Sequence, residues 1–253
     1  MTTMTTNRKY ALKRGTPDFR NFKYKIVRGL VLPPKYDMRN LCPPVYDQGD
    51  IGSCTANAIC AALRILYKTS HKPDLASSRL GLYYLERLME GTTTEDAGAV
   101  ISTGFKVCKK QGVFPESMWG YVPENLYKTP SQACMDVGEK HQILKYSAVP
   151  RSLYAFKFTL TQNKPIVIGI SVYDSFEGES VSKTGIVPMP KRKESLLGGH
   201  AILVVGYDEE KQHFICRNSW GTSWGDKGYF YLPYKFITNR GLSDDFWVAD
   251  LTE

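Results

Sequence analysis

The chain has 253 residues, 42% of them hydrophobic and 23% charged, which suits one large domain or two packed half-domains around an ample core. No run of about eighteen apolar residues occurs, so the sequence excludes a transmembrane helix and we expect no membrane partner. The net charge of +8 favours acidic partners. The basic residues are scattered, however, and no nucleic-acid-binding motif is present, so we expect no nucleic-acid partner.

Residues 1 to about 34 are polar and basic and end in Leu32-Pro33-Pro34. They lack the apolar core of a secretory signal peptide, so we expect an intracellular protein, located in the virion or host cytoplasm if the source is a virus. A disordered tail is one interpretation of this segment. We expect at least part of it to dock on the body, because it contains several large apolar residues: Phe19, Phe22, Tyr24, Ile26 and Val27.

The next part of the chain, to about residue 140, has helical periodicity. One helix face is predicted by the spacing of Ile59, Ala62, Leu63, Leu66 and Tyr67. That helix should begin near Ser53 or Cys54, with Ser53 or the preceding turn as its cap. A second helix is predicted over residues 79–90, ending at Gly91, and a third over residues 97–110, ending at Gly112.

From about residue 143 the pattern changes to β-strands. Strands are predicted over residues 165–172, 200–207, 213–218, 228–232 and 246–251, with a hairpin turn over residues 208–212. A helical half (about 45–140) followed by an antiparallel β half (about 143–251) predicts an α+β fold. A cleft between two such halves is a natural place for an active site.

The chain contains six cysteines, and none belongs to a C-x-x-C pair. We therefore expect no zinc site, and nothing in the sequence calls for another cofactor. Free thiols are favoured over disulfides because no signal peptide is evident. Cys60 and Cys216 are expected in the core. The sequence leaves open whether the cysteines other than Cys54 are paired: Cys42, Cys60, Cys108, Cys134 and Cys216.

Cys54 stands at the predicted start of a helix, directly after Gly52-Ser53. The first turn of a helix stabilises an anion, and the thiolate is the reactive form of cysteine, so this position suits a nucleophile. A nucleophilic cysteine also needs a base, usually a histidine held by a third group. His200 follows a glycine pair and opens a strong strand, which makes it the candidate base. The alternative is a strand-end histidine without a catalytic role.

Asn218 precedes a turn with two tryptophans framed by glycines, Trp220-Gly221 and Trp224-Gly225. In the functional interpretation, the Asn218 side-chain carbonyl accepts a ring N–H of His200, and Trp220 shields that bond from water. In the alternative interpretation, the segment is only a packed aromatic turn.

Taken together, these residues resemble the papain family of cysteine proteases. The family signature C-G-[SA]-C-[WY] has a histidine and an asparagine about 130–150 residues downstream. Here the histidine lies within that distance and the asparagine slightly beyond it. The resemblance spans about residues 35–251 and rests on four stretches: Gln48, Gly52-Ser53-Cys54, Gly199-His200-Ala201 and Asn218-Ser219-Trp220-Gly221. It implies a two-lobed fold, with a helical left half, an antiparallel β-barrel-like right half and the active site in the cleft between them.

The resemblance also implies a role for each position. Cys54 would attack the peptide carbonyl, and His200 would be its ion-pair partner and the acid for the leaving amine. Asn218 would orient His200. The Gln48 side chain, with the Cys54 backbone N–H, would bind the oxyanion. Protein or peptide substrate would be contacted by Gly98, Gly199 and Trp220, and we expect a monomer.

The sequence departs from the lysosomal members at two positions. Ile51 stands where they have a disulfide cysteine, and Thr55 replaces the usual aromatic residue. These features resemble a non-lysosomal branch known from microbes and large viruses. No His-His loop typical of dipeptide-trimming relatives is present, so we expect an endopeptidase. The alternatives are a catalytically silent papain-like binding protein and another thiol acyl transferase.

Residues 1–34 precede the predicted protease domain, which we assign to residues 35–253. One interpretation is a pro-segment that lies over the cleft or beside it, as in a zymogen. The other is a structural strap across the back of the domain. The sequence favours neither.

Overall fold

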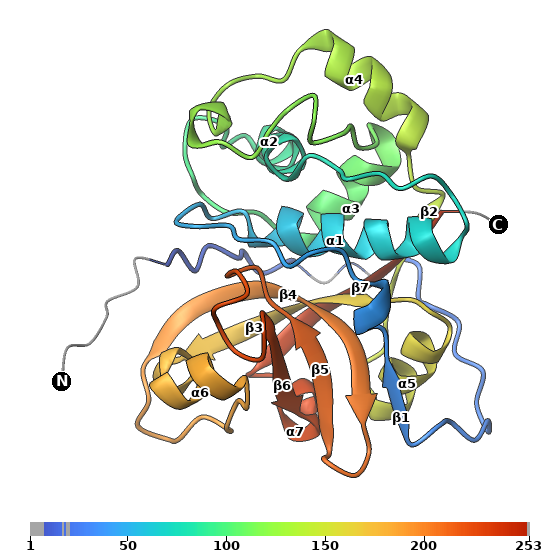
Figure 1. The fold of residues 1–253 in the computed structure, drawn as a ribbon, viewed down its shortest axis with the longest axis vertical. Coiled ribbons are helices and arrows are strands. Elements are labelled where there is room, and N and C mark those ends of the chain that lie inside the picture. Colours follow the sequence, from blue (N-terminus) through green and yellow to red (C-terminus); the bar gives the residue numbers. More distant parts are fainter. Residues whose placement is uncertain (1–7, 17, 19–20, 252–253) are drawn as a thin grey trace.

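The computed structural model describes residues 8–16, 18 and 21–251. Phe19, one of the apolar residues expected to dock, lies outside the described part. The chain folds into a helical half and a sheet half that face each other across one boundary (Figure 1). The predicted α+β arrangement is therefore confirmed. No helix in the described part is both long and apolar enough to cross a membrane.

The helical half contains α1 (Cys54–Thr69), α2 (Arg79–Glu90), α3 (Ile101–Lys110) and α4 (Gln132–Gly138). The prediction for α2 is confirmed at both ends. The Ser78 hydroxyl caps its start by accepting from the Gly81 N–H, and Gly91 ends it with a φ of 72°. The short 3-10 turns η2 (Pro123–Asn125) and η3 (Glu139–His141) also belong to this half. The turn η1 (Arg39–Leu41) lies against the sheet half, where Arg39 Nη1 donates to the Tyr231 hydroxyl at 3.3 Å.

The prediction that the third helix begins at residue 97 is wrong, because α3 begins at Ile101. Gly98 has a φ of 69°, in the left-handed region that a right-handed helix does not use. Val100 is extended and forms the N-cap. The four residues before α3 are therefore not helical, and their backbone N–H and C=O groups can bond to partners outside the helix.

The sheet half is antiparallel, with strand order β2-β7-β3-β4-β5-β6 and β1 paired to β4. Each predicted strand is present, and the short β1 and β2 were not predicted. The sheet is not closed into a barrel, so the barrel-like detail of the prediction is wrong. The strands are β1 (Lys35–Asp37), β2 (Lys145–Ala148), β3 (Ile166–Tyr173), β4 (Leu196–Asp208), β5 (His213–Arg217), β6 (Tyr229–Pro233) and β7 (Ser243–Asp250).

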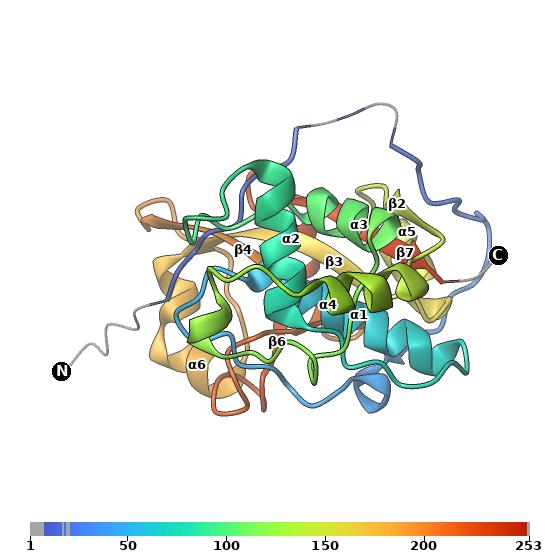
Figure 2. The ribbon, with the colours of Figure 1, turned by 90° about the horizontal axis from the view of Figure 1, so that it is seen from above.

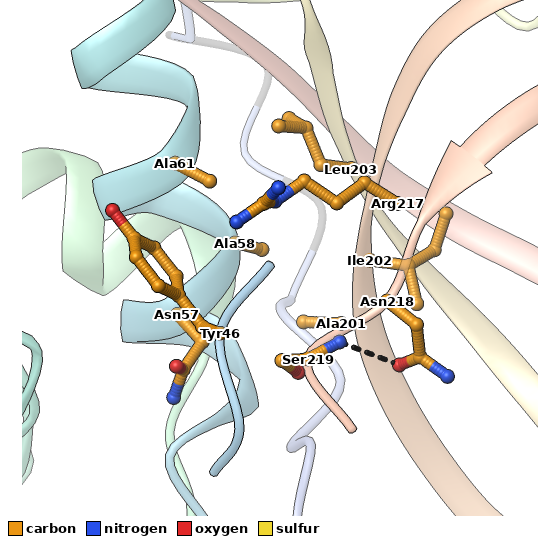
Figure 3. A pocket seen from close by; sticks show the side chains of 10 residues that line it. All are labelled: Tyr46, Asn57, Ala58, Ala61, Ala201, Ile202, Leu203, Arg217, Asn218 and Ser219. Atoms are coloured by element: carbon orange, nitrogen blue, oxygen red, sulfur yellow. Dashed lines mark hydrogen bonds between the residues drawn. The ribbon is translucent and has the colours of Figure 1, made fainter. Parts of the chain in front are cut away.

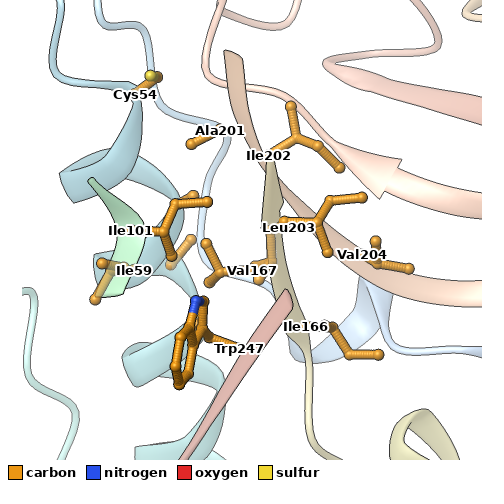
Figure 4. Packing of buried hydrophobic residues seen from close by; sticks show 14 of the residues in the cluster. Cys54, Ile59, Ile101, Ile166, Val167, Ala201, Ile202, Leu203, Val204 and Trp247 are labelled. Atoms are coloured by element: carbon orange, nitrogen blue, oxygen red, sulfur yellow. The ribbon is translucent and has the colours of Figure 1, made fainter. Parts of the chain in front are cut away.

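Both halves share one hydrophobic core. Apolar side chains from α1 and α3, such as Ile59 and Ile101, face those of the sheet, including Val167 on β3 and Leu203 on β4 (Figure 4). Burial of this apolar surface fixes α1 against β4, which positions the start of α1 beside the start of that strand. The remaining helical elements lie around the sheet: α5 (Leu153–Thr161), η4 (Asp174–Glu177), α6 (Glu179–Thr184) and α7 (Tyr234–Thr238).

The chain before β1 has two differently placed parts. Residues 8–14, called the crossing segment below, lie between the two halves (Figure 1). Later residues follow the outer edge of the molecule past β2 and α5 (Figure 2). There Tyr24 N–H donates to the Ala148 carbonyl at 2.9 Å, and the Tyr154 hydroxyl donates to the Val27 carbonyl at 2.9 Å. The expected docking of this segment is therefore confirmed for its described residues.

Candidate active site

Cys54 is the first residue of α1 and is fully buried. Ser53 occupies the N-cap, but its side chain makes no capping bond. Its hydroxyl pairs instead with the Tyr121 hydroxyl at 2.7 Å and accepts from Asn57 Nδ2 at 2.9 Å. Since the cap residue does not bond the helix's first amides, those N–H groups remain oriented toward the region around Cys54.

His200 and Asn218 are brought together, as predicted. His200 Nε2 lies 2.9 Å from Asn218 Oδ1, and both residues are almost fully buried. The Asn218 oxygen also accepts from the Ser219 N–H at 2.8 Å (Figure 3). The Trp220 ring stacks on the His200 ring with centroids 4.8 Å apart and planes at 25°. His200 is therefore held by a hydrogen bond and by an aromatic face that excludes water.

Cys54 approaches the His200 strand at Ala201. Hydrogen bonding from the Ala201 backbone lowers the pKa of the Cys54 thiol, but burial outweighs it and raises that pKa to about 12. Burial is also the main influence on His200. It lowers the imidazole pKa to about 4, against the Asn218 hydrogen bond that raises it. In this structure both groups are consequently neutral at pH 7.

Gln48 lies at the same boundary and is buried. Its Nε2 donates to the Ile51 carbonyl at 2.9 Å, and its Oε1 accepts from the Ser219 hydroxyl at 2.6 Å. These bonds fix the amide plane. An amide nitrogen carries two hydrogens, so one N–H can serve a ligand while the other holds Ile51.

The space expected for a substrate is occupied by the crossing segment. Leu12 N–H donates to the Gly199 carbonyl at 3.2 Å, and Lys13 N–H donates to the Ala99 carbonyl at 3.0 Å. At Gly98, a Cβ atom would lie 1.6 Å from the Ala11 carbonyl oxygen. Gly98 and Gly199, both predicted to contact substrate backbone, thus contact the chain's own backbone.

One small pocket lies beside the candidate residues. A pocket of about 10 Å³ between α1 and the sheet is lined by Asn218 and Ser219 (Figure 3), which is room for about one water molecule. Among the described residues, no group of three or more His, Cys, Asp or Glu side chains could hold a metal ion.

The papain family cysteine protease model matches residues 32–245. The chain belongs to this family. It is 37% identical over 242 residues to an uncharacterised peptidase C1-like protein of Acanthamoeba polyphaga mimivirus, covering 90% of this chain and 76% of the relative. It is 30% identical to cathepsin K of Gallus gallus, covering 79% of this chain and 58% of cathepsin K.

Solved structures of proteases have the same fold. Xylellain, a cysteine protease from Xylella fastidiosa, superposes with a TM-score of 0.91 at 39% identity over 98% of both chains. The bromelain protease from Ananas comosus, solved in complex with an inhibitor, gives a TM-score of 0.71 at 20% identity, over 87% of this chain and all of the other. The predicted family, its microbial and viral branch and the papain-like fold are therefore confirmed.

This papain-family protease contains a hydrogen-bond network that the sequence did not reveal. The Asp96 carboxylate accepts from the Gly52 N–H at 3.1 Å and from the Tyr83 hydroxyl at 2.6 Å. The Tyr83 oxygen accepts from the Gly98 N–H at 2.9 Å. The network ties the turn before Cys54 to the residues before α3, at the place where the lysosomal members have a disulfide cysteine and this protease has Ile51.

Thr55, where lysosomal members have an aromatic residue, donates its hydroxyl proton to Glu86 at 2.6 Å. Glu86 is fully buried, and burial raises the pKa of its carboxyl well above the usual value. Burial therefore disfavours the charged form of the Glu86 carboxyl, and any charge that it keeps raises the pKa of the Cys54 thiol. The sequence could have indicated that Glu86 is buried. Leu82 and Tyr83 precede it by four and three residues, so the three side chains share the buried face of α2.

Proposed function

We propose that this papain-family protease is an endopeptidase in which Cys54 and His200 form the reactive thiolate–imidazolium pair. The observation that carries the proposal is the buried His200–Asn218 hydrogen bond of 2.9 Å. Because that bond uses Nε2, the other ring nitrogen, Nδ1, is available to face Cys54. Asn218 thereby orients the ring for proton exchange with the sulfur.

The reaction proceeds in two steps. The Cys54 sulfur forms a bond to the peptide carbonyl carbon, the C–N bond breaks, and His200 gives its proton to the leaving amine. Water, deprotonated by His200, then hydrolyses the thioester and regenerates the thiol. The Gln48 side chain and the Cys54 N–H stabilise the oxyanion in both steps, which suits the fixed position of the Gln48 amide.

The substrate-binding residues are proposed from the contacts of the crossing segment. Gly98 and Gly199 both lie against peptide backbone there, and Trp220 covers His200. A substrate strand in the same place would use the Gly199 and Ala99 carbonyls that now bind Leu12 and Lys13. Glycine at positions 98 and 199 supports this proposal, because a side chain at either would meet that strand.

We propose further that residues 8–14 are an inhibitory pro-segment, and that the later residues of 1–34 act as a strap. Residues near the N-terminal end of the crossing segment, such as Tyr10, lie against Trp220 and His200. In a productive substrate, the residues beside His200 would be those C-terminal to the scissile bond, because His200 protonates the leaving amine. The crossing segment therefore runs opposite to a productive substrate, which protects it from cleavage.

Covalent labelling tests the proposed function. An epoxide inhibitor of thiol proteases should label the chain once, at Cys54, as read by intact mass and peptide mapping. The remaining cysteines serve as internal controls, since none lies beside a histidine–asparagine pair in the described structure. A label on another cysteine, or no label after the crossing segment is displaced, would overturn the assignment.

Displacement of the crossing segment should depend little on pH between about 5 and about 7. In the closed form, burial raises the Cys54 pKa to about 12 and lowers the His200 pKa to about 4, so the two groups hold one proton, on the sulfur. The proposed thiolate–imidazolium pair of the open form also holds one proton, on His200, so opening neither takes up nor releases a proton over this interval. The labelling rate of the native chain, divided by that of an opened variant, should therefore stay constant within about twofold over this interval. A rise or fall of about tenfold would contradict the transfer of the proton from Cys54 to His200 on opening.

Ala11→Phe supplies the opened variant for this comparison. A Cβ atom at Gly52 would lie 2.8 Å from the Ala11 Cβ, and one at Gly98 would lie 2.7 Å from it. Phenylalanine at position 11 therefore has no room between these two glycines, and it brings no titrating group. Dividing by its rate removes the intrinsic pH dependence of the inhibitor reaction.

A further inference from the structure

A carboxylate and an indole ring beside His200 bind one guanidinium group. The Arg8 Cζ lies 4.1 Å from the centre of the Trp220 ring, and Arg8 Nη1 donates to Glu177 Oε2 at 2.6 Å. The Tyr10 hydroxyl donates to the other oxygen of Glu177. The Arg8 and Glu177 side chains are 20% and 19% exposed, so the ion pair is largely shielded from water.

We propose that Trp220 and Glu177 form a subsite for the arginine side chain of a substrate, on the leaving-amine side of the scissile bond. The proposal rests on the proposed function. An indole face attracts a cation, and a carboxylate accepts the planar N–H groups of guanidinium. Lysine would be a weaker occupant because its ammonium is compact and strongly hydrated. Arg8 thus occupies the position that we propose for the substrate arginine side chain.

The side of the scissile bond follows from the catalytic geometry. Trp220 stacks on His200, and His200 protonates the leaving amine in the proposed reaction. The residue that carries this amine must therefore lie next to the Trp220 ring. Its side chain can reach the position where the Arg8 guanidinium now lies.

Other carboxylates of the same region have different partners. Asp174 Oδ2 accepts from the Ser195 N–H at 2.8 Å. Glu194 accepts from the Ser175 N–H at 3.1 Å and from the Lys191 N–H at 3.0 Å. These two acids hold the backbone of their own loops, whereas Glu177 binds side chains of the crossing segment. The chain as a whole has a net charge of +8. Glu177 therefore makes the subsite on the leaving-amine side locally favourable for a cation.

Matched peptides test the subsite. The full chain is assayed with Ala11→Phe, which opens the cleft, and Arg8→Ala, which removes the internal guanidinium. The internally quenched peptides share one upstream sequence and carry Arg, Gln or Glu directly after the scissile bond. We expect kcat/KM to be about tenfold higher for Arg than for Gln, and lowest for Glu. Adding Glu177→Gln should reduce the preference for Arg to about twofold or less. Mass spectrometry of the products checks that all peptides are cut at the same bond.

Glu194→Gln in the Arg8→Ala, Ala11→Phe chain is the matched control, because it removes a neighbouring carboxylate that accepts from the Ser175 and Lys191 amides of its own loop. It should leave the selectivity unchanged. Equal cleavage of the Arg and Gln peptides, or an Arg preference that survives Glu177→Gln, overturns the subsite and leaves the protease function intact. Failure to cleave any peptide, together with failure to label Cys54, overturns the proposed function and the subsite with it.

Discussion

Replacing Cys54 by alanine should abolish peptide hydrolysis, and replacing His200 by alanine should lower kcat/KM by about 10³–10⁴-fold. Cys54 supplies the sulfur at the start of α1, and the neighbouring hydroxyls of Ser53 and Thr55 are bonded to Tyr121 and Glu86. His200 is the histidine held by Asn218, so its loss removes both the base and the acid of the reaction. The measurement is hydrolysis of one quenched peptide by the Ala11→Phe chain with and without each substitution.

Two further substitutions should lower the activity less than Cys54→Ala and His200→Ala do. Gln48→Ala removes one oxyanion donor and should lower kcat by about 10²-fold. Asn218→Ala leaves the imidazole in place but unoriented, so its effect should be smaller than that of His200→Ala. His213→Ala is the matched control. That half-buried histidine on β5 packs against Tyr231, away from Cys54, and its loss should leave kcat/KM unchanged. If His200→Ala kept more than about a tenth of the activity, His200 would not be the general acid.

Much of the site could be predicted because its residues have local signatures. Cys54 follows a glycine turn at a helix start, His200 follows a glycine pair, and Asn218 precedes a tryptophan turn. Each signature alone has an ordinary structural explanation. Their combined order and spacing match one family, and the fold then follows from that family. The same reasoning predicted α2 to the residue, with Gly91 as the signal for its end.

The residues that sequence reasoning missed are charged side chains with distant partners. Asp96 bonds Gly52, and Arg8 bonds Glu177. Along the sequence, each resembles a solvated surface charge, since only the tertiary fold brings its partner near. The start of α3 was missed for a related reason. The backbone at Gly98 is fixed by Tyr83 and by the crossing segment, and these contacts override the local helical pattern.

Sheet closure is a third kind of feature that sequence patterns do not determine. Alternating apolar residues predict that a strand exists, but whether the outer strands pair with each other depends on twist and on the helices that cover the edges. In this protein β1 joins the middle of the ladder by pairing with β4. Its three residues, Lys35–Asp37, are too few for a recognisable strand pattern.

Ala11→Phe should raise the rate of epoxide labelling at Cys54 by at least about tenfold over the native chain at pH 7. The native segment is held by backbone bonds to Gly199 and Ala99 and by ion pairs of Arg8, Lys9 and Lys13. The Lys9 and Lys13 pairs have the more exposed cations and stabilise weakly, so we expect most of the docking energy to come from the close fit between the two halves. A ring at position 11 removes that fit, and water then reaches Cys54 and His200. Their buried, neutral state gives way to the ion pair, which is the reactive form.

Val31→Phe is the matched control, because Val31 belongs to the same N-terminal segment but its side chain is 99% exposed. The same substitution there adds the same ring without disturbing a contact, so the labelling rate should stay at the native value. A chain that begins at Leu32 gives the upper limit of the effect, and Ala11→Phe should approach it. Equal labelling of the native, Ala11→Phe and shortened chains would show that residues 8–14 do not restrict access to Cys54. The crossing segment would then be a structural part of the protease and not its inhibitor.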